Sequence, residues 1–505
     1  MPLEFPITLG IGLTALDALL RFTFIARVII RRTPVPDTLA WILLLALVPF
    51  FSGFLYALIG ERRLGTRRAR KFETITQDIE HRAVEFWHRE HLDWTGEDSP
   101  DAHANVPAST RLDHAGMVRL LTNLASMPAL IGNHLDLIGD SEQFVSRLIA
   151  DIDAATAHVH LLFYIWEDDA VGRRLADAVI RAAERGVTCR VLVDAVGSKS
   201  LVGSDTWDRM HAAKVKAFES LPVNPIRALL YRVDLRNHRK IAVIDGHIAY
   251  VGSQNITEEN FRKRLGSNAG PWIDANVRMR GPAVQALQAT FLRDWVLDSE
   301  ERLQNETRYF LQSATGEPTP RVGASIVQAI PSGPGPRPDA IHQGFLKMLY
   351  AAREEIIMTT PYFVPDEATK GALINAALRG IDVTIIVPEV SDSRLVAAAS
   401  RAHFEDLMDA GIKIRLHQKG LLHSKAAVVD RTLAVIGSAN FDQRSFWLNF
   451  EITLFVYDTD FASLLRFLQM QYHTDSREIN PRSWRRRPLW KRFRDNSAQL
   501  LGPLL

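Results

Sequence analysis

The stretch that decides the fold occurs twice in the chain. Residues 238–261 read HRKIAVIDGHIAYVGSQNITEENF, and residues 423–446 read HSKAAVVDRTLAVIGSANFDQRSF. At an offset of 185 they align without a gap and share ten identities in 24 positions. Six of the identities carry polar groups or tight-turn glycines, namely the pairs His238/His423, Lys240/Lys425, Asp245/Asp430, Gly252/Gly437, Ser253/Ser438 and Asn255/Asn440. Chance does not place those types in register, so the chain contains an internal duplication.

Each copy predicts a strand, a turn, a second strand and a loop. In an H-x-K pair on a strand, both side chains point to the same face, because the side-chain period is two. The apolar pairs that follow end at Asp245 and Asp430, where we expect the turns. The second apolar run leads to G-S-x-N, whose small residues and amide can approach an anionic group closely.

Two such sets facing each other would form a phosphate site. They supply two lysines and two asparagines for the phosphate oxygens, two serine hydroxyls that shape the site, and one histidine on either side of the phosphorus. A lone histidine on a strand is usually packed or on the surface. Duplication of the full pattern argues against that interpretation, and because both copies keep every chemical residue it also argues against an inactive scaffold.

The regions around the two copies alternate helices with short, continuously apolar strands, a pattern typical of buried parallel sheets. The predicted helix and strand pairs are 143–157 with 158–165, 171–185 with 187–193, 344–353 with 355–359, and 369–379 with 381–387. Residues 316–338 hold six prolines and four glycines, so we place the boundary between the halves near their start. We therefore predict an α/β fold with two duplicated halves, 134–315 and 316–475, packed around one shared active site and preceded by a helical connector over 72–133.

The overall composition is that of an ordinary globular protein. Of 505 residues, 47% are hydrophobic and 23% are charged, and the formal charge is +2, which excludes a disordered chain. Cys189 is the only cysteine, so an internal disulfide framework and a zinc site built on a Cys/His cluster are both excluded. A single cysteine favours the reducing side of a membrane for the catalytic part.

The N-terminus is apolar enough to suggest a membrane anchor over residues 1–71. Residues 38–60 (TLAWILLLALVPFFSGFLYALIG) contain no charged side chain in 23 positions, which predicts a transmembrane helix. Residues 7–30 are apolar but include Asp17, Arg21 and Arg27, so they form either a second span, with Asp17 paired to Arg21 one turn away, or an amphipathic helix on the membrane surface.

The charges that flank these segments predict the topology. Residues 61–71 (ERRLGTRRARK) hold six basic residues against one acidic residue, which by the positive-inside rule places the downstream chain in the cytoplasm. We therefore expect an inner (plasma) membrane protein with a cytoplasmic catalytic domain. No cleaved signal peptide is expected, because no basic region precedes the first apolar segment.

The C-terminal segment, residues 476–505, is basic and aromatic. Residues 477–494 contain eight basic residues interleaved with Trp484, Trp490 and Phe493, a pattern suited to an anionic membrane surface. A solvated basic tail or a nucleic-acid patch would have a similar composition. The apolar N-terminus favours lipid.

The duplicated pattern resembles the phospholipase D superfamily, whose mark is two HKD motifs in one chain. Within it, the layout is similar to that of the bacterial cardiolipin synthases, from TLAW in the second apolar segment through YIWEDDAVG, TTPYFVPD and SFWLNFE to the terminal LLGPLL. The resemblance implies a two-step phosphatidyl transfer that needs no metal and no cofactor. One histidine forms a phosphohistidine, and the other protonates the leaving alcohol and later deprotonates the incoming one.

Carried onto this chain, the resemblance assigns catalytic roles to the motif residues. His238 is the expected nucleophile and His423 the general acid and base, with the reverse assignment still open. Lys240, Lys425, Asn255 and Asn440 would hold the phosphoryl oxygens, with Ser253 and Ser438 beside them. Asp245 and Asp430 belong to the motif, but we expect them to serve the turn backbone or to position the lysines. Asp274 (PWIDANV) and Glu451 (LNFEITL) match the carboxylates that orient the two histidines and select their tautomers.

The resemblance favours phosphatidylglycerol as donor and acceptor, which yields cardiolipin and glycerol. The motifs themselves do not distinguish this reaction from hydrolysis of phospholipids to phosphatidic acid. A nuclease or other phosphodiesterase of the superfamily and a non-catalytic lipid-binding scaffold are the remaining alternatives. We expect an anionic membrane and no nucleic acid as partners, and the oligomeric state stays open.

Overall fold

The structure is a computed structural model. It describes residues 4–31, 35–48, 50–61, 68, 70–71, 74–75, 84–85, 87–88, 92–94, 108–222, 232, 234–261, 270–299, 301, 321–335 and 338–502. The chain divides into two compact units. One comprises residues 1–69 with 223–235, and the other comprises residues 70–222 with 236–505.

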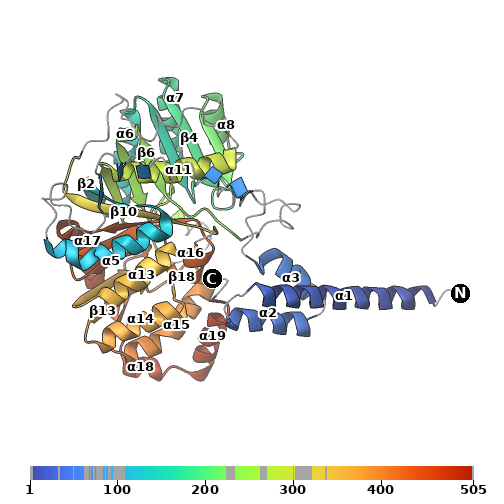
Figure 1. The fold of residues 1–505 in the computed structure, drawn as a ribbon. Coiled ribbons are helices and arrows are strands. Elements are labelled where there is room, and N and C mark those ends of the chain that lie inside the picture. The colour runs from blue at the N-terminus through green and yellow to red at the C-terminus, as the bar shows by residue number, and fades with distance from the viewer. Residues whose placement is uncertain are drawn as a thin grey trace. The chain divides into compact units, whose positions relative to one another are not determined.

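The first unit contains three apolar helices, drawn in dark blue in Figure 1: α1 (Glu4–Ile30), α2 (Val35–Leu47) and α3 (Phe51–Ile59). Val28, Leu45 and Tyr56, one from each helix, form its small buried core. Asp17 and Arg21 form an ion pair at 2.8 Å across one turn of α1, as their spacing predicts.

The prediction of one continuous helix over 38–60 is wrong, because α2 ends at Leu47 and α3 begins only at Phe51. Between them, Phe50 adopts a positive φ of 62°, and its backbone N–H donates to Asp17 Oδ1 at 2.7 Å. The 13 residues of α2 and the nine of α3 each span less than the roughly 30 Å of a hydrocarbon core. Within the described ranges, no helix combines the length and the apolarity that crossing a bilayer requires.

The second unit is built on one long mixed sheet, in which each half contributes seven strands in the same spatial order. In half one the order is β2 (Ala129–Ile138), β9 (Asn276–Arg280), β7 (Ile248–Gly252), β6 (Ile241–Ile244), β3 (His158–Phe163), β4 (Thr188–Asp194) and β5 (Lys216–Ser220). In half two it is β10 (Ser325–Ser332), β19 (Glu451–Val456), β17 (Leu433–Gly437), β16 (Ala426–Val429), β11 (Glu355–Thr359), β13 (Asp382–Pro388) and β14 (Lys413–His417). The antiparallel pair of β2 and β10 joins the halves.

Two short strands extend this sheet beyond the repeated set. β1 (Asp93–Trp94) pairs with β2, and β20 (Ser476–Glu478) pairs antiparallel with β14. The first residues of the C-terminal segment therefore belong to the sheet of half two.

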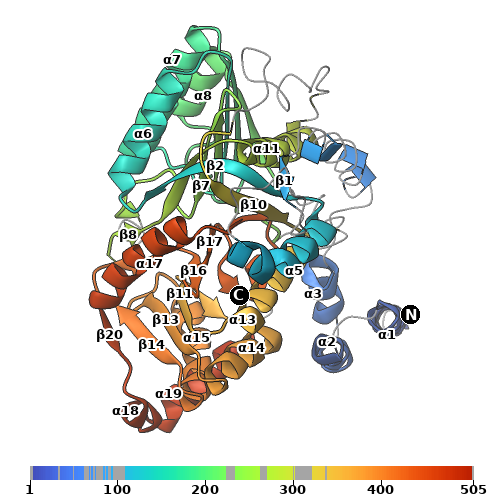
Figure 2. The ribbon, with the colours of Figure 1, turned by 60° about the vertical axis from the view of Figure 1, so that its left-hand side comes forward.

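Helices cover both faces of each half (Figure 2). Half one carries α6 (Ser141–Asp153), α7 (Ala170–Glu184) and α8 (Asp205–Ala212) on one face and α11 (Ala283–Ser299) on the other. Half two repeats this with α13 (Ala340–Ala351), α14 (Glu367–Leu378) and α15 (Arg394–Asp409) opposite α17 (Thr459–Thr474). α5 (Ala108–Ala125) packs on α13, and α19 (Leu489–Gln499) packs on α15. Because both faces are covered, β3 and β11 are buried almost throughout.

The predicted α/β repeat is therefore confirmed. Each predicted helix and strand pair has a counterpart, for example α7 with β4 and α14 with β13. Aspartates mark the helix starts, since Asp140, Asp169 and Asp366 each accept a hydrogen bond from the backbone N–H three residues later. Two such halves joined edge to edge bring the two copies of the motif together.

Candidate active site

The two histidines of the repeat each face a carboxylate from the opposite half. His238 Nδ1 lies 3.0 Å from both carboxylate oxygens of Glu451, and His423 Nδ1 lies 2.6 Å from Asp274 Oδ1. All four side chains are buried. Each of these imidazoles is thus oriented by a carboxylate of the other half, and both pairs cross between the halves.

Short parallel pairings between the halves produce this exchange. β15 (Leu421–Leu422) pairs with β8 (Trp272–Ile273), so His423 and Asp274 follow at neighbouring positions. A single bridge between Asn237 and Phe450 does the same for His238 and Glu451. The backbone N–H of His238 donates to Phe450 O at 2.9 Å, and that of His423 donates to Ile273 O at 2.8 Å.

The H-x-K pairs lie just before the strands rather than within them, because β6 begins at Ile241 and β16 at Ala426. The physical reason is the pairing just described, which commits the histidine backbone to the other half. Each lysine turns back on this segment. Lys240 Nζ donates to His238 O at 2.7 Å, and Lys425 Nζ donates to His423 O at 2.6 Å.

The two serines contact the carboxylates that orient the histidines. Ser253 Oγ donates to Asp274 Oδ1 at 2.6 Å, and Ser438 Oγ donates to Glu451 Oε2 at 2.5 Å. Each hydroxyl proton is committed to its carboxylate, so a phosphate would find only acceptor lone pairs on these serines. Both serine hydroxyls therefore support the carboxylates that orient the histidines.

The two asparagines retain unused amide atoms. Asn255 Oδ1 accepts the backbone N–H of Ile165 at 3.1 Å, while its buried Nδ2 has no partner within the described chain. In Asn440 it is the buried Oδ1 that has no partner there. An unpaired buried amide is costly, and a bound phosphate oxygen would satisfy the Nδ2 group of Asn255.

Asp245 and Asp430 lie at the tips of the two hairpins, both with φ of 51°, a conformation that aspartate tolerates. The Asp245 carboxylate accepts backbone N–H groups of Thr156, Ala157 and His158, each at 2.8 Å. Asp430 does the same for residues 353–355 at 2.8 to 2.9 Å. Each aspartate thus ties its hairpin to the start of β3 or β11, and none of these hydrogen bonds involves His238 or His423.

Burial and neighbouring positive charge favour the neutral form of both imidazoles. Burial, together with the charge of Lys240 and Lys425, lowers the pKa of His238 to about 4, against the opposing effect of Glu451. Burial followed by the charge of Lys425 lowers the pKa of His423 to about 4. Both lysines influence both histidines, so the four groups form one electrostatic cluster. An anion bound between them would raise the pKa of both imidazoles.

The lysines and the carboxylates of the cluster are shifted as well. Burial lowers the pKa of Lys425 to about 8 and that of Lys240 well below its ordinary value. Burial alone would raise the pKa of Glu451. The charge of His238, its hydrogen bond to Glu451 and the charge of Lys240 outweigh burial, so the pKa of Glu451 is lowered overall. His423 has the corresponding effect on Asp274. Both carboxylates are therefore ionised at neutral pH.

Several contributors to the site were not predicted from the sequence. The Trp272 ring stacks on His423 at a centroid distance of 4.1 Å, and the Tyr164 ring meets His238 edge-on at 4.8 Å. Asn449 Nδ2 donates to Glu451 Oε1 at 3.2 Å. Trp272 and Asn449 each lie two residues before a histidine-orienting carboxylate, which is the only sequence signal that marks them.

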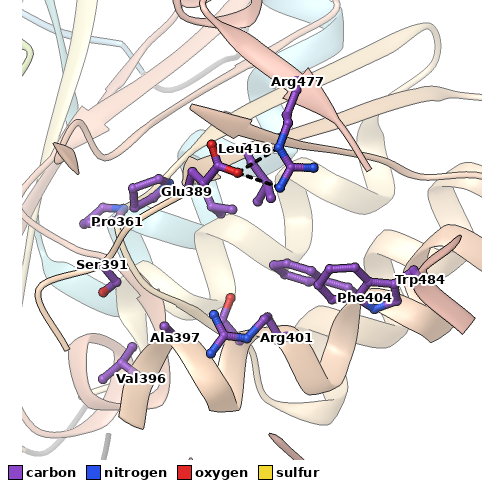
Figure 3. Close-up of a pocket in the computed structure, with 13 residues that line it drawn as sticks. Pro361, Glu389, Ser391, Val396, Ala397, Arg401, Phe404, Leu416, Arg477 and Trp484 are labelled. Carbon is purple, nitrogen blue, oxygen red and sulfur yellow. Dashed lines mark hydrogen bonds and ion pairs between the residues drawn. The ribbon is translucent and has the colours of Figure 1, made fainter. Parts of the chain in front are cut away.

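A pocket of about 190 Å³ lies at the carboxyl ends of β13 and β14 (Figure 3). Arg401 on α15, Arg477 on β20 and Trp484 on α18 (Pro481–Arg485) are among its lining residues, and an ion pair of Glu389 with Arg477 at 2.6 Å lies on its wall. Neither His238 nor His423 lines this pocket.

In the described part of the chain, no group of three His, Cys, Asp or Glu side chains is arranged to hold a metal ion.

Residues 148–295 and 345–468 match the family described as "Cardiolipin synthase, PLD-like domain", and each range contains one copy of the motif. The chain belongs to this family. Residues 20–61 also match the N-terminal family described as "Phospholipase_D-nuclease N-terminal". Membership identifies the chain as an enzyme of the phospholipase D superfamily.

Similarity to members of the family extends over nearly the whole chain. The chain is 36% identical over 479 residues to Cardiolipin synthase A of Salmonella arizonae, covering 95% of each chain, and equally similar to that of Salmonella paratyphi B. Among solved structures, the phosphatidylserine synthase of Haemophilus influenzae matches with a TM-score of 0.58 at 16% identity, covering 77% of this chain and 100% of that one. This last likeness concerns the fold alone.

Proposed function

We propose that the protein is a cardiolipin synthase, which transfers the phosphatidyl group of one phosphatidylglycerol to a second and releases glycerol. The observation that carries the proposal is the pair of buried histidines, each bound to a carboxylate of the opposite half and both close to the same two lysines. Similarity to cardiolipin synthases over 95% of the chain supports the choice of lipid substrate.

In the first step, His238 Nε2 attacks the phosphorus. Its Nδ1 proton is held by Glu451, so the tautomer leaves the Nε2 lone pair available. A bond forms between Nε2 and phosphorus while the bond from phosphorus to the headgroup oxygen breaks. His423, protonated in the substrate complex, transfers its proton to that oxygen and glycerol departs.

In the second step, the glycerol hydroxyl of another phosphatidylglycerol attacks the phosphohistidine. His423, now neutral, accepts the hydroxyl proton, and the bond between phosphorus and His238 breaks. Cardiolipin leaves, and both histidines return to their starting protonation states. The negative charge of the incoming phosphodiester raises the pKa of His423, which explains how an imidazole that is neutral without substrate becomes the acid.

Four side chains would hold the phosphoryl oxygens during both steps. Lys240 and Lys425 supply positive charge from opposite halves, and Asn255 supplies its unpaired Nδ2. Asn440, whose unpaired atom is Oδ1, would donate once its amide is turned so that Nδ2 faces the phosphate. Because these donors are buried and positioned before substrate arrives, they stabilise the developing charge without reorganisation. Asp245 and Asp430 act indirectly, because they hold each hairpin on the sheet and do not bind the phosphate.

We place the enzyme at the inner membrane, with the catalytic unit on the cytoplasmic side and the N-terminal unit as its anchor. The outer surface of α1 to α3 exposes large apolar side chains, including Leu16, Phe22, Leu43 and Phe54. Apolar surface of this extent is typical of a membrane or protein contact. The basic run after α3 supports the cytoplasmic side.

The direct test is turnover by the purified full chain with phosphatidylglycerol in detergent micelles and a chelator present. We expect cardiolipin and glycerol in equal amounts. Phosphatidic acid as the sole product would reassign the enzyme as a hydrolase. Cleavage of a DNA oligomer without any lipid turnover would overturn the proposal.

A further inference from the structure

We propose that the outer face of α19 docks the catalytic unit onto an anionic bilayer, as a second membrane contact besides the N-terminal unit. The proposal deepens the proposed function, since it concerns how an enzyme of lipids meets its substrate. The docking surface consists of Leu489, Trp490 and Phe493 on α19 and of Leu500 and Leu501 directly after it.

The inner face of α19 is held in place. Asp495 is fully buried and forms two ion pairs, one with Arg487 at 2.8 Å and one with Arg401 of α15 at 3.7 Å. Ala498 packs in a small apolar cluster with residues of α15 and with Val364 of β12 (Phe363–Val364). These contacts fix the rotation of the helix, so its opposite face must point outward.

That outer face is strongly apolar. Leu489 is 79% exposed, Phe493 76% and Leu500 81%. Their spacings of four and seven residues place them in one stripe along the helix, with Trp490 beside it. A fixed helix that exposes several large apolar side chains on one face marks an interaction surface, here with Asn496 between Phe493 and Leu500. Trp beside leucines is typical of the membrane interface.

The charge around the stripe selects a lipid partner. The arginine-rich run does not act as a uniform basic tail, because five of its eight basic residues form ion pairs within the protein, namely Arg477, Arg485, Arg487, Arg492 and Arg494. Arg482, Arg486 and Lys491 form no ion pair with the residues that the structure describes. Beside Trp490 of the docking surface lie two cations, since Lys491 Nζ is 5.6 Å and the Arg494 guanidinium carbon 5.7 Å from its ring centroid. Exposed cations beside exposed apolar side chains complement an anionic headgroup layer.

The stripe leads toward the active site. α19 lies along α15. Just beyond the end of α19, Gly502 lies so close to Gln443 and Val364 that a Cβ added to it would be 3.4 Å from Gln443 Nε2 and 3.5 Å from Val364. Val364 pairs with Asp442 of β18 (Phe441–Asp442), directly after Asn440. Insertion of the stripe into the headgroup layer would therefore bring the edge of the site that carries Asn440 close to the lipid.

The test uses the full chain carrying one environment-sensitive fluorophore. Cys189 is buried, so a label on Phe493→Cys reports from the stripe. The matched control is Phe467→Cys on α17, which is 64% exposed and lies on the other face of the half-two sheet (Figure 2). With vesicles containing phosphatidylglycerol we expect a blue shift and protection from iodide for the label at 493, and little change at 467.

Equal immersion or equal exposure of both labels would overturn the proposal, as would full protection of the label at 493 before vesicles are added, which would indicate contact between copies. Measurements of turnover distinguish failure of the docking proposal from failure of the proposed function. The variant Trp490→Ser with Phe493→Ser should lose about tenfold in rate on vesicles, equivalent to about 1.4 kcal/mol, yet keep its rate on dispersed short-chain phosphatidylglycerol. Docking fails if the variant matches the parent on vesicles, whereas the proposed function fails if the parent makes no cardiolipin in either form.

Discussion

Replacing Glu451 by glutamine tests whether the exchanged carboxylates drive the chemistry. The change keeps the shape of a fully buried side chain that binds His238, Ser438 and Asn449. It removes the charge that stabilises an imidazolium or phosphohistidine cation at His238. Two unit charges about 4 Å apart interact by about 4 kcal/mol at an effective dielectric constant near 20, which corresponds to a rate loss of about 10³.

The assay is release of glycerol from phosphatidylglycerol across a range of pH. Because the charge of Glu451 raises the pKa of His238, its loss lowers that pKa further. The acidic limb of the rate profile, where His238 becomes protonated and stops acting as nucleophile, should therefore move to lower pH.

The matched control is Glu478→Gln, which removes a carboxylate paired with Arg415 on the exposed edge strand β20. This variant should keep the parent rate, and thermal melts should establish that both proteins are folded. A rate for Glu451→Gln within about threefold of the parent would refute the role of the carboxylate, since it would leave under 1 kcal/mol for the interaction.

Three further outcomes follow from the same geometry. His238→Ala and His423→Ala should each abolish transfer. With a lipid whose leaving group needs no proton, His423→Ala should still accumulate the phosphatidyl group on His238. A phosphatidyl group trapped instead on His423 in the His238→Ala protein would reverse the assignment. Asp245→Ala should leave the backbone N–H groups of residues 156–158 without an acceptor and lower the free energy of unfolding by about 1–3 kcal/mol, with Asp430→Ala behaving alike; loss of activity at unchanged stability would instead place these aspartates in the chemistry. Burial lowers the pKa of His158, His238, His403 and His423 to about 4. Between pH 6.5 and 4 the unfolded chain therefore binds more protons than the folded chain, and each histidine lowers the free energy of unfolding by up to about 1.4 kcal/mol per pH unit on acidification. Denaturant melts that give the same free energy of unfolding from pH 7 to 5 would contradict this.

Much of the fold could be predicted because its signals are local. Alternating helices and short apolar strands identify α7, β4, α14 and β13 with bounds close to those observed. The repeat at an offset of 185 identifies two equivalent halves and all the motif residues. The break between α2 and α3 was missed, because the uninterrupted apolarity of residues 38–60 reports no turn, and a hydrogen bond from Phe50 to Asp17 in α1 stabilises it.

The sequence by itself therefore determined the type of fold, the duplication and the set of chemical groups, since each depends on residue order along a single strand or helix. Tertiary structure alone decided which groups meet. Parallel bridges between distant segments give His238 to Glu451 and His423 to Asp274, direct the serines to those carboxylates, and bury the lysines beside both histidines. The same holds for the C-terminal run, whose arginines look alike in sequence. Only the folded structure determines which of them find carboxylates, and packing against α15 determines which side of α19 remains exposed.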